Sequence, residues 1–472
     1  MAGQLLNGTT TPTGPSFNLT PSATKTTGTY NYLSSSDFNF LNQYLPDTYE
    51  KEFERYGNRS VASFLRMVGA ELPTNSDMIK WTEQGRLHTQ YTGVTAKAAG
   101  FSSGSQTFTV AVSACNFRVG QTVLLSSATD AAAKKGIVTA VSGADFTVAY
   151  YTEETAAPFT VSTTTDIVAY VYGSEFAKGT TGMVGALEAD VDIFENSPII
   201  IKDKYAISGS DMAQIGWVEV STDSGTGYLW YLKSEHETRL RFEDYLEMAM
   251  IEGVPAAATP TATNGAIDNG YKGTEGLFYT IEQRGNVWDG GNPSTLANFD
   301  DIIVRLDKQG SIQENVLFLN RQFSFDIDDM LAQQNSYGSG GTSYGLFDND
   351  EQMALNLGFS GFKRGYEFYK TDWKYLNDAT LRGGITADNV NGVLVPAGTT
   401  TVYDMVLGKN AKRPFLHVRY RASETEDRRM KTWLTGSAGN ASNSDLDAME
   451  VHFLSERALC TMGANNFFIF KS

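Results

Sequence analysis

The side chains that most often carry catalysis are few in this sequence and lie far apart. None of the four histidines belongs to an HExxH motif or lies beside a cysteine at the spacing of metal ligands. A GxSxG motif, which would present a nucleophilic serine, is absent. We therefore expect no catalytic residue, no cofactor and no metal site, and we expect structural roles for His88, His236, His417 and His452.

Acidic residues at two places in the C-terminal half resemble cation ligands. Asp326 and Asp329 lie three positions apart and would share one face of a helix, as in carboxylate pairs that bind a divalent ion. Near a helix N-terminus the helix dipole favours acidic side chains without any metal, and we prefer this explanation. Residues 348–351 lack the glycine and the final glutamate of a calcium loop. A metal-dependent enzyme using Asp326 and Asp329 stays as an alternative hypothesis.

Arginines are concentrated between positions 419 and 431, where acidic residues separate them. A guanidinium group binds a carboxylate through two parallel hydrogen bonds, so this cluster suits acidic side chains of a neighbouring subunit. An ordinary solvated surface would explain the same residues. The aromatic side chains at the distal part of the N-terminal arm also give it a surface to bury. The candidate inter-subunit contacts are Arg419, Arg421, Arg428, Arg429, Phe38 and Phe40.

Composition limits the class of protein. The chain of 472 residues has a formal net charge of −17, which argues against a nucleic-acid-binding protein that neutralises many phosphates. Cys115 and Cys460 are its two cysteines, so a disulfide framework is excluded and folding in a reducing cytoplasm is expected. We see no signal peptide and no apolar run of about 18 residues, and therefore expect no membrane partner.

The elements that must position these residues can be read from periodicity. Residues 1–36 are polar and aperiodic, so this arm is not expected to fold alone. Short alternating runs in residues 95–170 predict a small antiparallel barrel or sandwich. Ser221–Pro255 predicts one long amphipathic helix. Residues 294–335 follow an α-β-α order, and the apolar run 465–470 predicts a strand of the core sheet.

Three stretches carry a resemblance to a known family. They are YLPDTYEKEF with SVASFLRMVGA, then VYGSEFAKGT, and then EHETRLRFEDYLEMAMIEG. Together with the order of the elements, they resemble the major capsid proteins of tailed double-stranded DNA bacteriophages, and they look most like those of crAss-like phages. The resemblance implies an α+β fold, shared with the herpesvirus capsid floor, that has a long spine helix, an extended E-loop and an inserted small all-β domain.

The resemblance also implies domain boundaries. These are an N-terminal arm at 1–45, short helices of a peripheral domain at 46–77, E-loop arms at 78–94 and 171–190, an inserted β domain at 95–170, the rest of the peripheral domain at 191–293 with its spine helix at 222–252, and a mainly axial domain at 294–472 whose last strands return to the core.

The function implied by the resemblance is assembly. Copies of the chain would form hexamers and pentamers of an icosahedral shell that encloses double-stranded DNA and contacts it on the inner face without sequence specificity. Portal, auxiliary or decoration proteins would be further partners. The protein would be located in the virion after assembly in the bacterial cytoplasm. Alternatives are an encapsulin-like compartment shell and a glycan-binding or adhesion protein that acts through the β insertion.

Overall fold

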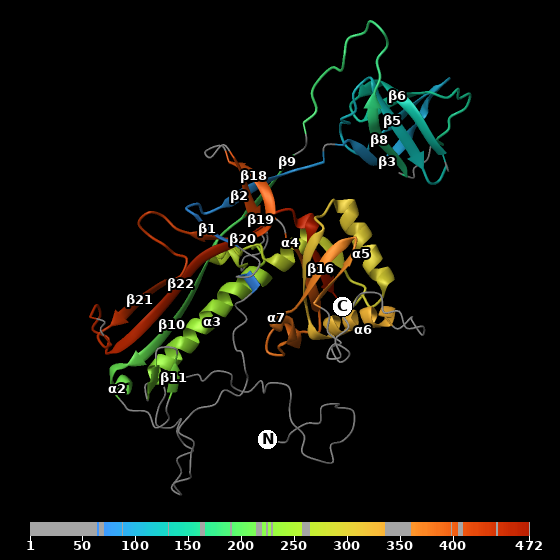
Figure 1. The fold of residues 1–472 in the computed structure, drawn as a ribbon. Coiled ribbons are helices and arrows are strands. Elements are labelled where there is room, and N and C mark those ends of the chain that lie inside the picture. The colour runs from blue at the N-terminus through green and yellow to red at the C-terminus, as the bar shows by residue number, and fades with distance from the viewer. Residues whose placement is uncertain are drawn as a thin grey trace. The chain divides into compact units, whose positions relative to one another are not determined.

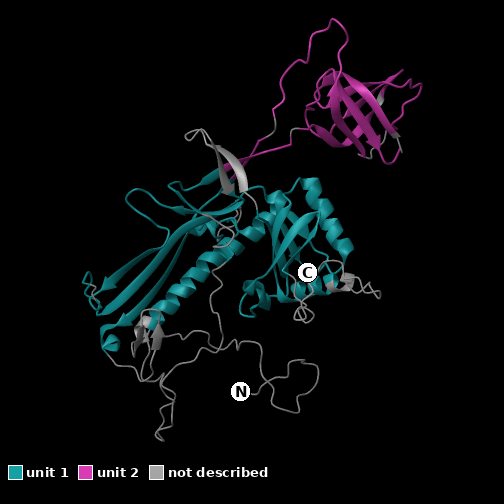
Figure 2. Ribbon diagram, viewed as in Figure 1, with its two compact units in different colours: residues 1–80, 195–472 teal, residues 81–194 magenta. Residues whose placement is uncertain are grey.

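The computed structural model describes residues 64–65, 70–86, 88–130, 132–160, 166–188, 191–213, 220–222, 225–227, 230–256, 265–335, 360–397, 399–404, 409–439 and 442–471 (Figure 1). The chain divides into two compact units, residues 81–194 and residues 1–80 with 195–472 (Figure 2). The predicted N-terminal arm, with Phe38 and Phe40, lies outside the described residues.

Residues 81–194 contain a closed six-stranded barrel. Around the barrel the order of strands is β3 (Gln90–Ser102), β4 (Ser105–Thr109), β7 (Asp145–Tyr150), β6 (Ala132–Ser142), β5 (Gln121–Ser127) and β8 (Ile167–Ser174). Alternate side chains point inward, and Phe108, Phe117, Phe146 and Phe159 fill the interior. The interior is therefore a packed core rather than a channel.

The barrel is larger than the insertion predicted at residues 95–170. Its first strand begins at Gln90 and its last strand ends at Ser174, so parts of both predicted E-loop arms belong to barrel strands. The reason is closure, because β3 pairs with β8 near its start and with β4 near its end. Beyond the barrel, β2 (Ile79–Gln84) pairs with β9 (Val191–Asn196) as a two-stranded ribbon.

The other unit contains a five-stranded sheet built around the long strand β22 (Ala448–Thr461). One side of β22 pairs with β10 (Ile199–Ser208), and its other side pairs first with β21 (Lys431–Gly436) and then with β20 (Leu416–Arg421). The outermost strand, β1 (Ala70–Thr74), runs parallel to β20. Residues 70–74 were predicted among short helices, but Pro73 lacks a backbone N–H and suits the edge of a sheet.

A long helix, α3 (Trp230–Glu252), lies along this sheet (Figure 1). Phe242 and Leu246 pack against alternate side chains of β10 and β22, and the Phe242 ring lies 5.7 Å from that of Phe453. The helix was predicted to begin at residue 222, but Val220–Thr222 and Gly225–Gly227 form two short paired strands. Two glycines in this segment disfavour a helix and favour a turn, which explains the later start.

The second sheet has six strands and helices on both faces. The order is β13 (Asn286–Trp288), β23 (Phe468–Lys471), β17 (Val390–Pro396), β14 (Glu314–Leu319), β16 (Tyr366–Asp372) and β15 (Gly361–Arg364). Helices α5 (Leu296–Gln309) and α6 (Arg321–Asn335) cover one face, while α4 (Leu277–Arg284) and the end of α3 pack on the other. The hydroxyl oxygen of Thr295 caps α5, and Gly310 ends it in a left-handed conformation, φ 71°.

The described residues contain several smaller elements as well. They are α2 (Gly209–Met212), α7 (Lys374–Asn377), the hairpin of β18 (Thr399–Asp404) with β19 (Lys409–Pro414), and three short 3₁₀ turns at Ile267–Asn269, Arg382–Gly384 and Ala464–Asn466. None of the helices in the described part of the chain combines the length and apolar character that a membrane crossing requires.

Candidate interface site

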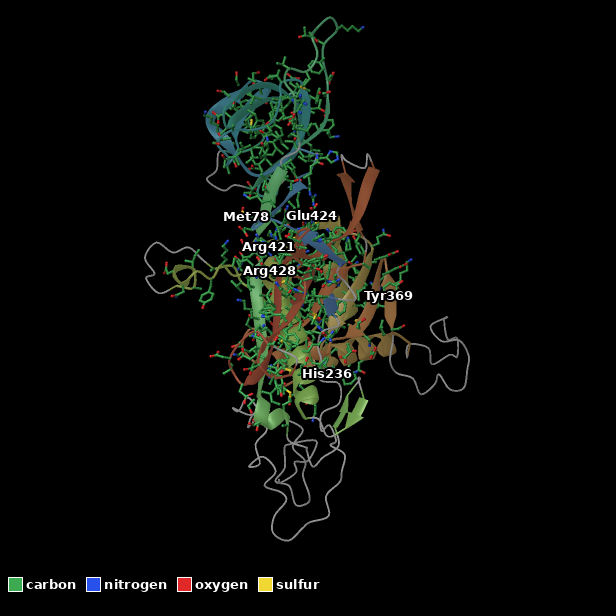
Figure 3. All side chains as sticks on the ribbon, turned by 90° about the vertical axis from the view of Figure 1, so that its left-hand side faces the viewer. Met78, His236, Tyr369, Arg421, Glu424 and Arg428 are labelled. Carbon is green, nitrogen blue, oxygen red and sulfur yellow. The ribbon has the colours of Figure 1, made fainter. Side chains whose placement is uncertain are left out.

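The four arginines predicted to contact a neighbouring subunit come from two adjoining segments. Arg419 and Arg421 lie on β20 two positions apart, so both side chains point to the same side of the sheet. Arg428 and Arg429 follow in the connection between β20 and β21. Figure 3 shows Arg421 and Arg428 close together, with His236 in a different part of the unit. The structure thus brings the cluster together.

A buried carboxylate on β22 lies between two of these arginines. Glu456 is 6% exposed, and its two oxygens lie 3.2 Å from Nη1 of Arg421 and 3.0 Å from Nε of Arg428. Arg421 also forms an ion pair with Asp77, and the hydrogen bond that the guanidinium donates to this carboxylate raises the pKa of Arg421. In return, the guanidinium lowers the pKa of Asp77. This network ties the segment after β1 to the centre of the sheet.

A second carboxylate, Glu71 on β1, pairs with Arg429 and lies 3.6 Å from Nη1 of Arg457 on β22. Arg457 is buried, and burial lowers its pKa. Its guanidinium also donates to Oγ of Ser455 at 2.9 Å and to the carbonyl oxygen of Arg429 at 3.0 Å. Strands β1 and β22 flank β20 in the sheet. The ion pair of Glu71 with Arg457 therefore joins these two strands across β20.

Carboxylate partners in a neighbouring subunit were predicted for these arginines from the sequence. Three of the four have carboxylate partners in their own chain. Strand pairing explains this, because β1 and β22 flank β20 although they are distant in the sequence. A contact of these side chains with a neighbouring subunit stays a prediction. Arg419 differs: among the described residues it has no carboxylate partner, and its Nε is buried without a hydrogen bond.

The sequence interpretation missed Glu71 and Glu456, the partners that organise the cluster. A signal for Glu456 was present, because it lies within the apolar run MEVHFLSERALC. A charged residue inside a buried strand requires a partner of opposite charge. Glu71 carried no comparable signal, since its strand has only five residues and does not lie in a long apolar run.

A cavity of about 620 Å³ lies beside the arginines, between α3 and the five-stranded sheet. Four acidic side chains, two arginines and four apolar side chains line it. Glu247 is buried and accepts a hydrogen bond from the backbone N–H of Phe64 at 2.8 Å. None of the lining residues is a serine, cysteine or histidine. They are Leu65, Glu71, Glu243, Leu246, Glu247, Val418, Asp427, Arg429, Met430 and Arg457.

His452 and the two cysteines contact other parts of the protein as structural side chains do. The His452 ring stacks on Trp433 with centroids 5.0 Å apart, and its Nε2 lies 2.8 Å from Oγ1 of Thr435. Cys115 and Cys460 are buried free thiols, and burial raises the pKa of Cys115. Among the described residues, no three histidine, cysteine or acidic side chains are grouped as metal ligands.

Asp326, one member of the acidic pair predicted on α6, is engaged by protein groups. The two carboxylate oxygens of Asp326 accept hydrogen bonds from Nδ2 of Asn292 at 2.6 Å and from Nε2 of Gln322 at 3.0 Å. Neighbouring Asp328 pairs with Nζ of Lys370 at 2.5 Å. Neutral amide donors around Asp326 are typical of a structural hydrogen-bond network, and nothing here favours the hypothesis of a metal-dependent enzyme.

Comparisons with known proteins give remote structural similarities. No protein-family profile and no curated protein sequence matches the chain. Among solved structures, a chain of Mycobacterium phage Ogopogo is 11% identical, with 93% of this chain and 99% of that chain covered and a TM-score of 0.40. A chain of the bacteriophage PhiM1 mature capsid is 10% identical, with coverages of 90% and 91% and a TM-score of 0.37.

A third similar chain belongs to the capsid of a native GTA particle, with 10% identity, coverages of 91% and 96% and a TM-score of 0.36. Two of these three are described as capsid chains, the class of protein that the sequence resembles. None is described as coming from a crAss-like phage, so that narrower resemblance has no support among them. Because identities and TM-scores are this low, function has to be inferred from the chain's own residues.

Proposed function

We propose that this protein is the major capsid protein of a tailed double-stranded DNA phage and that its copies assemble into a closed shell. The observation that carries the proposal is the apolar surface of the ribbon formed by β2 and β9. Val191 and Ile193 lie two positions apart on β9, point to one side, and are 51% and 66% exposed. A ribbon of two strands is marginally stable alone, so this surface suits contact with another copy.

The arrangement of charges supports the same proposal. Arg419 has no carboxylate partner among the described residues, although three arginines around it do. A guanidinium without a carboxylate partner, in a chain that is acidic overall, is suited to a carboxylate of a second copy. The proposal also includes assembly into hexamers and pentamers. It further includes contacts between subunits through Arg421, Arg428, Arg429, Phe38 and Phe40.

The proposal has three further parts. The shell encloses DNA, it has portal and auxiliary proteins as partners, and the protein is located in the virion after assembly in the host cytoplasm. With a net charge of −17, contacts to DNA would be local and would not depend on sequence. The runner-up is an encapsulin-like compartment shell, which would form particles without packaged DNA. The two are separated by measuring nuclease-protected double-stranded DNA in particles isolated from infected cells.

The first test is mass photometry and negative-stain microscopy of the purified protein over a range of concentrations. Rings, sheets or closed shells of many copies are the expected result. Ile193→Asp should reduce the large species because it places a charge on the exposed apolar side of the ribbon. Val304→Asp is the matched control, since Val304 is 50% exposed on α5 and does not belong to the ribbon.

Two outcomes count against the proposal. The first is a monomer at every concentration, also when the protein is produced together with its own phage's other capsid genes. The second is equal loss of particles in the Ile193 and Val304 variants, because the ribbon would then have no special role in assembly.

A further inference from the structure

Three tyrosines form an exposed patch on the outer wall of the barrel. Tyr170 and Tyr172 lie two positions apart on β8 and point outward, opposite to the buried Ile167 and Ala169. They are 40% and 47% exposed, and Tyr151, which follows β7, is 50% exposed. A folded domain normally covers part of such large aromatic rings, so their grouping on one wall suggests a binding surface.

Contacts between neighbouring strands join these rings into one patch. Nζ of Lys135, on β6, lies 5.7 Å from the centre of the Tyr172 ring. The backbone N–H of Tyr151 donates to the carbonyl oxygen of Lys135 at 3.2 Å, and the Tyr151 hydroxyl donates to Oε2 of Glu175 at 2.5 Å. We call Tyr151, Tyr170, Tyr172, Lys135 and Glu175 the tyrosine platform.

The barrel restricts how a ligand can bind. Phe108, Phe146 and Phe159 are fully buried in its interior, so no ligand can occupy the centre. The six strands close on one another, so this barrel offers no free edge to which a peptide strand could be added. A ligand must therefore lie on the outer wall, as oligosaccharides do on strand faces of small barrels.

The charge and size of the platform narrow the class of ligand. One ammonium group and one carboxylate leave it without net charge, which does not favour a polyanion such as nucleic acid. Each tyrosine has roughly 200 Å² of side-chain surface. Because about half of each of the three side chains is exposed, the platform offers about 300 Å² of aromatic surface. This area is well below the roughly 800 Å² per partner of a stable protein interface, so a second copy is not favoured.

We propose that the tyrosine platform binds a neutral glycan. The C–H faces of sugar rings pack on Tyr170 and Tyr172, which lie roughly 7 Å apart along the strand. Sugar hydroxyls accept hydrogen bonds from Nζ of Lys135 and donate to the carboxylate of Glu175. The hydroxyls of Tyr170 and Tyr172, which have no hydrogen-bond partner among the described residues, complete the contacts.

The test uses the full-length protein and soluble neutral hexasaccharides of glucose, N-acetylglucosamine, mannose and galactose. Saturation-transfer NMR detects binding, and titration calorimetry gives the Kd. We expect at least one hexasaccharide to bind and the double variant Tyr170→Ala/Tyr172→Ala to raise the Kd at least tenfold. Lys135→Ala, which leaves the rings in place, should raise the Kd severalfold and guards against misfolding of the double variant. Tyr369→Ala is the control, since Tyr369 is as exposed but belongs to the other unit.

Several results would overturn the inference. They are absence of binding to all four hexasaccharides, a Kd that does not change in either platform variant, or platform-dependent binding of single-stranded DNA or heparin in their place. Loss of particles in the double variant, seen by mass photometry, would instead identify the platform as a contact between copies. Glycan binding does not depend on assembly, so failure of the shell proposal would leave this measurement interpretable.

Discussion

The side-chain amide of Asn196 donates a hydrogen bond to the backbone carbonyl oxygen of Leu459, 2.7 Å away across 263 positions of sequence. The same Nδ2 donates to the carbonyl oxygen of Glu275 at 3.0 Å. Oδ1 accepts from Oγ1 of Thr274 at 3.1 Å and from the backbone N–H of Glu275 at 2.8 Å. Asn196 ends β9 and is buried, so it joins the end of the exposed ribbon to the central strand β22.

Asn196→Ala should therefore destabilise the larger unit. The substitution removes the partner of two backbone carbonyl oxygens, of two backbone N–H groups and of the Thr274 hydroxyl, and a buried group left unsatisfied costs about 1 to 3 kcal/mol. We expect a loss of about 3 kcal/mol in the free energy of unfolding, measured by urea denaturation at concentrations where the protein is monomeric. The control is Asn269→Ala, whose amide donates to Gly265 in an exposed turn and should change the free energy of unfolding by less than about 0.5 kcal/mol. Equal effects of the two variants would refute a central role for Asn196.

Glu456→Gln should be costly for a different reason. The substitution removes the buried negative charge that lies between Arg421 and Arg428; Arg421 keeps its ion pair with Asp77, whereas Arg428 loses its carboxylate partner. Breaking a fully buried ion pair typically costs about 3 to 5 kcal/mol, and because both arginines are partly exposed we expect a smaller loss, of about 1 to 3 kcal/mol. Glu426→Gln breaks the exposed pair with Lys431 and should cost about 0 to 1 kcal/mol. Comparison of urea midpoints tests this, and a Glu456 variant as stable as the Glu426 variant would contradict the interpretation of the network.

Local features of the fold could be predicted from the sequence, whereas pairings between distant segments could not. The sequence predicts a helix that is capped by Ser294 or Thr295 and stopped by Gly310, and α5 is capped by Thr295 and ends at Gly310, because capping depends on neighbouring residues. The apolar run near the C-terminus likewise forms β23, between β13 and β17. The start of α3 was placed too early because helical periodicity outweighed the local effect of two glycines.

The arginine cluster shows why the candidate site was harder to predict than the elements. Composition identified the side chains that carry charge, but their partners come from β1 and β22. The register of β1 with β20 places Glu71 beside Val418, and nothing local in either strand specifies that register. Arginine clusters therefore indicate that carboxylates are near without indicating which chain supplies them.

The acid stability of the barrel should depend on Asp166. Its carboxylate accepts hydrogen bonds from Thr129 and from Oγ of Ser127, and these lower its pKa from 3.8 to about 2. Because the pKa is lower in the folded state, the stabilisation is complete above the unfolded pKa and is lost as the pH falls through about 2. Asp166→Asn should therefore lower the barrel's melting temperature at pH 5. The melting temperature of this variant should also fall less between pH 5 and pH 2 than that of the wild type. Glu153→Gln, an exposed change in the same unit, should leave the wild-type profile, and an unchanged profile for Asp166→Asn would disprove the assignment.

Arg419 provides the sharpest separation of assembly from folding. Its neighbours Arg421, Arg428 and Arg429 are held by carboxylates of their own chain, whereas Arg419 has no such partner among the described residues. If it binds a carboxylate of a second copy, Arg419→Glu should strongly reduce large particles in mass photometry while changing the free energy of unfolding of the monomer by less than about 1 kcal/mol. Arg429→Glu is the matched control and should lower monomer stability, because it sets a second negative charge beside Glu71. An Arg419 variant that unfolds readily yet still forms particles would show that this arginine serves the fold of one chain and not the contact between chains.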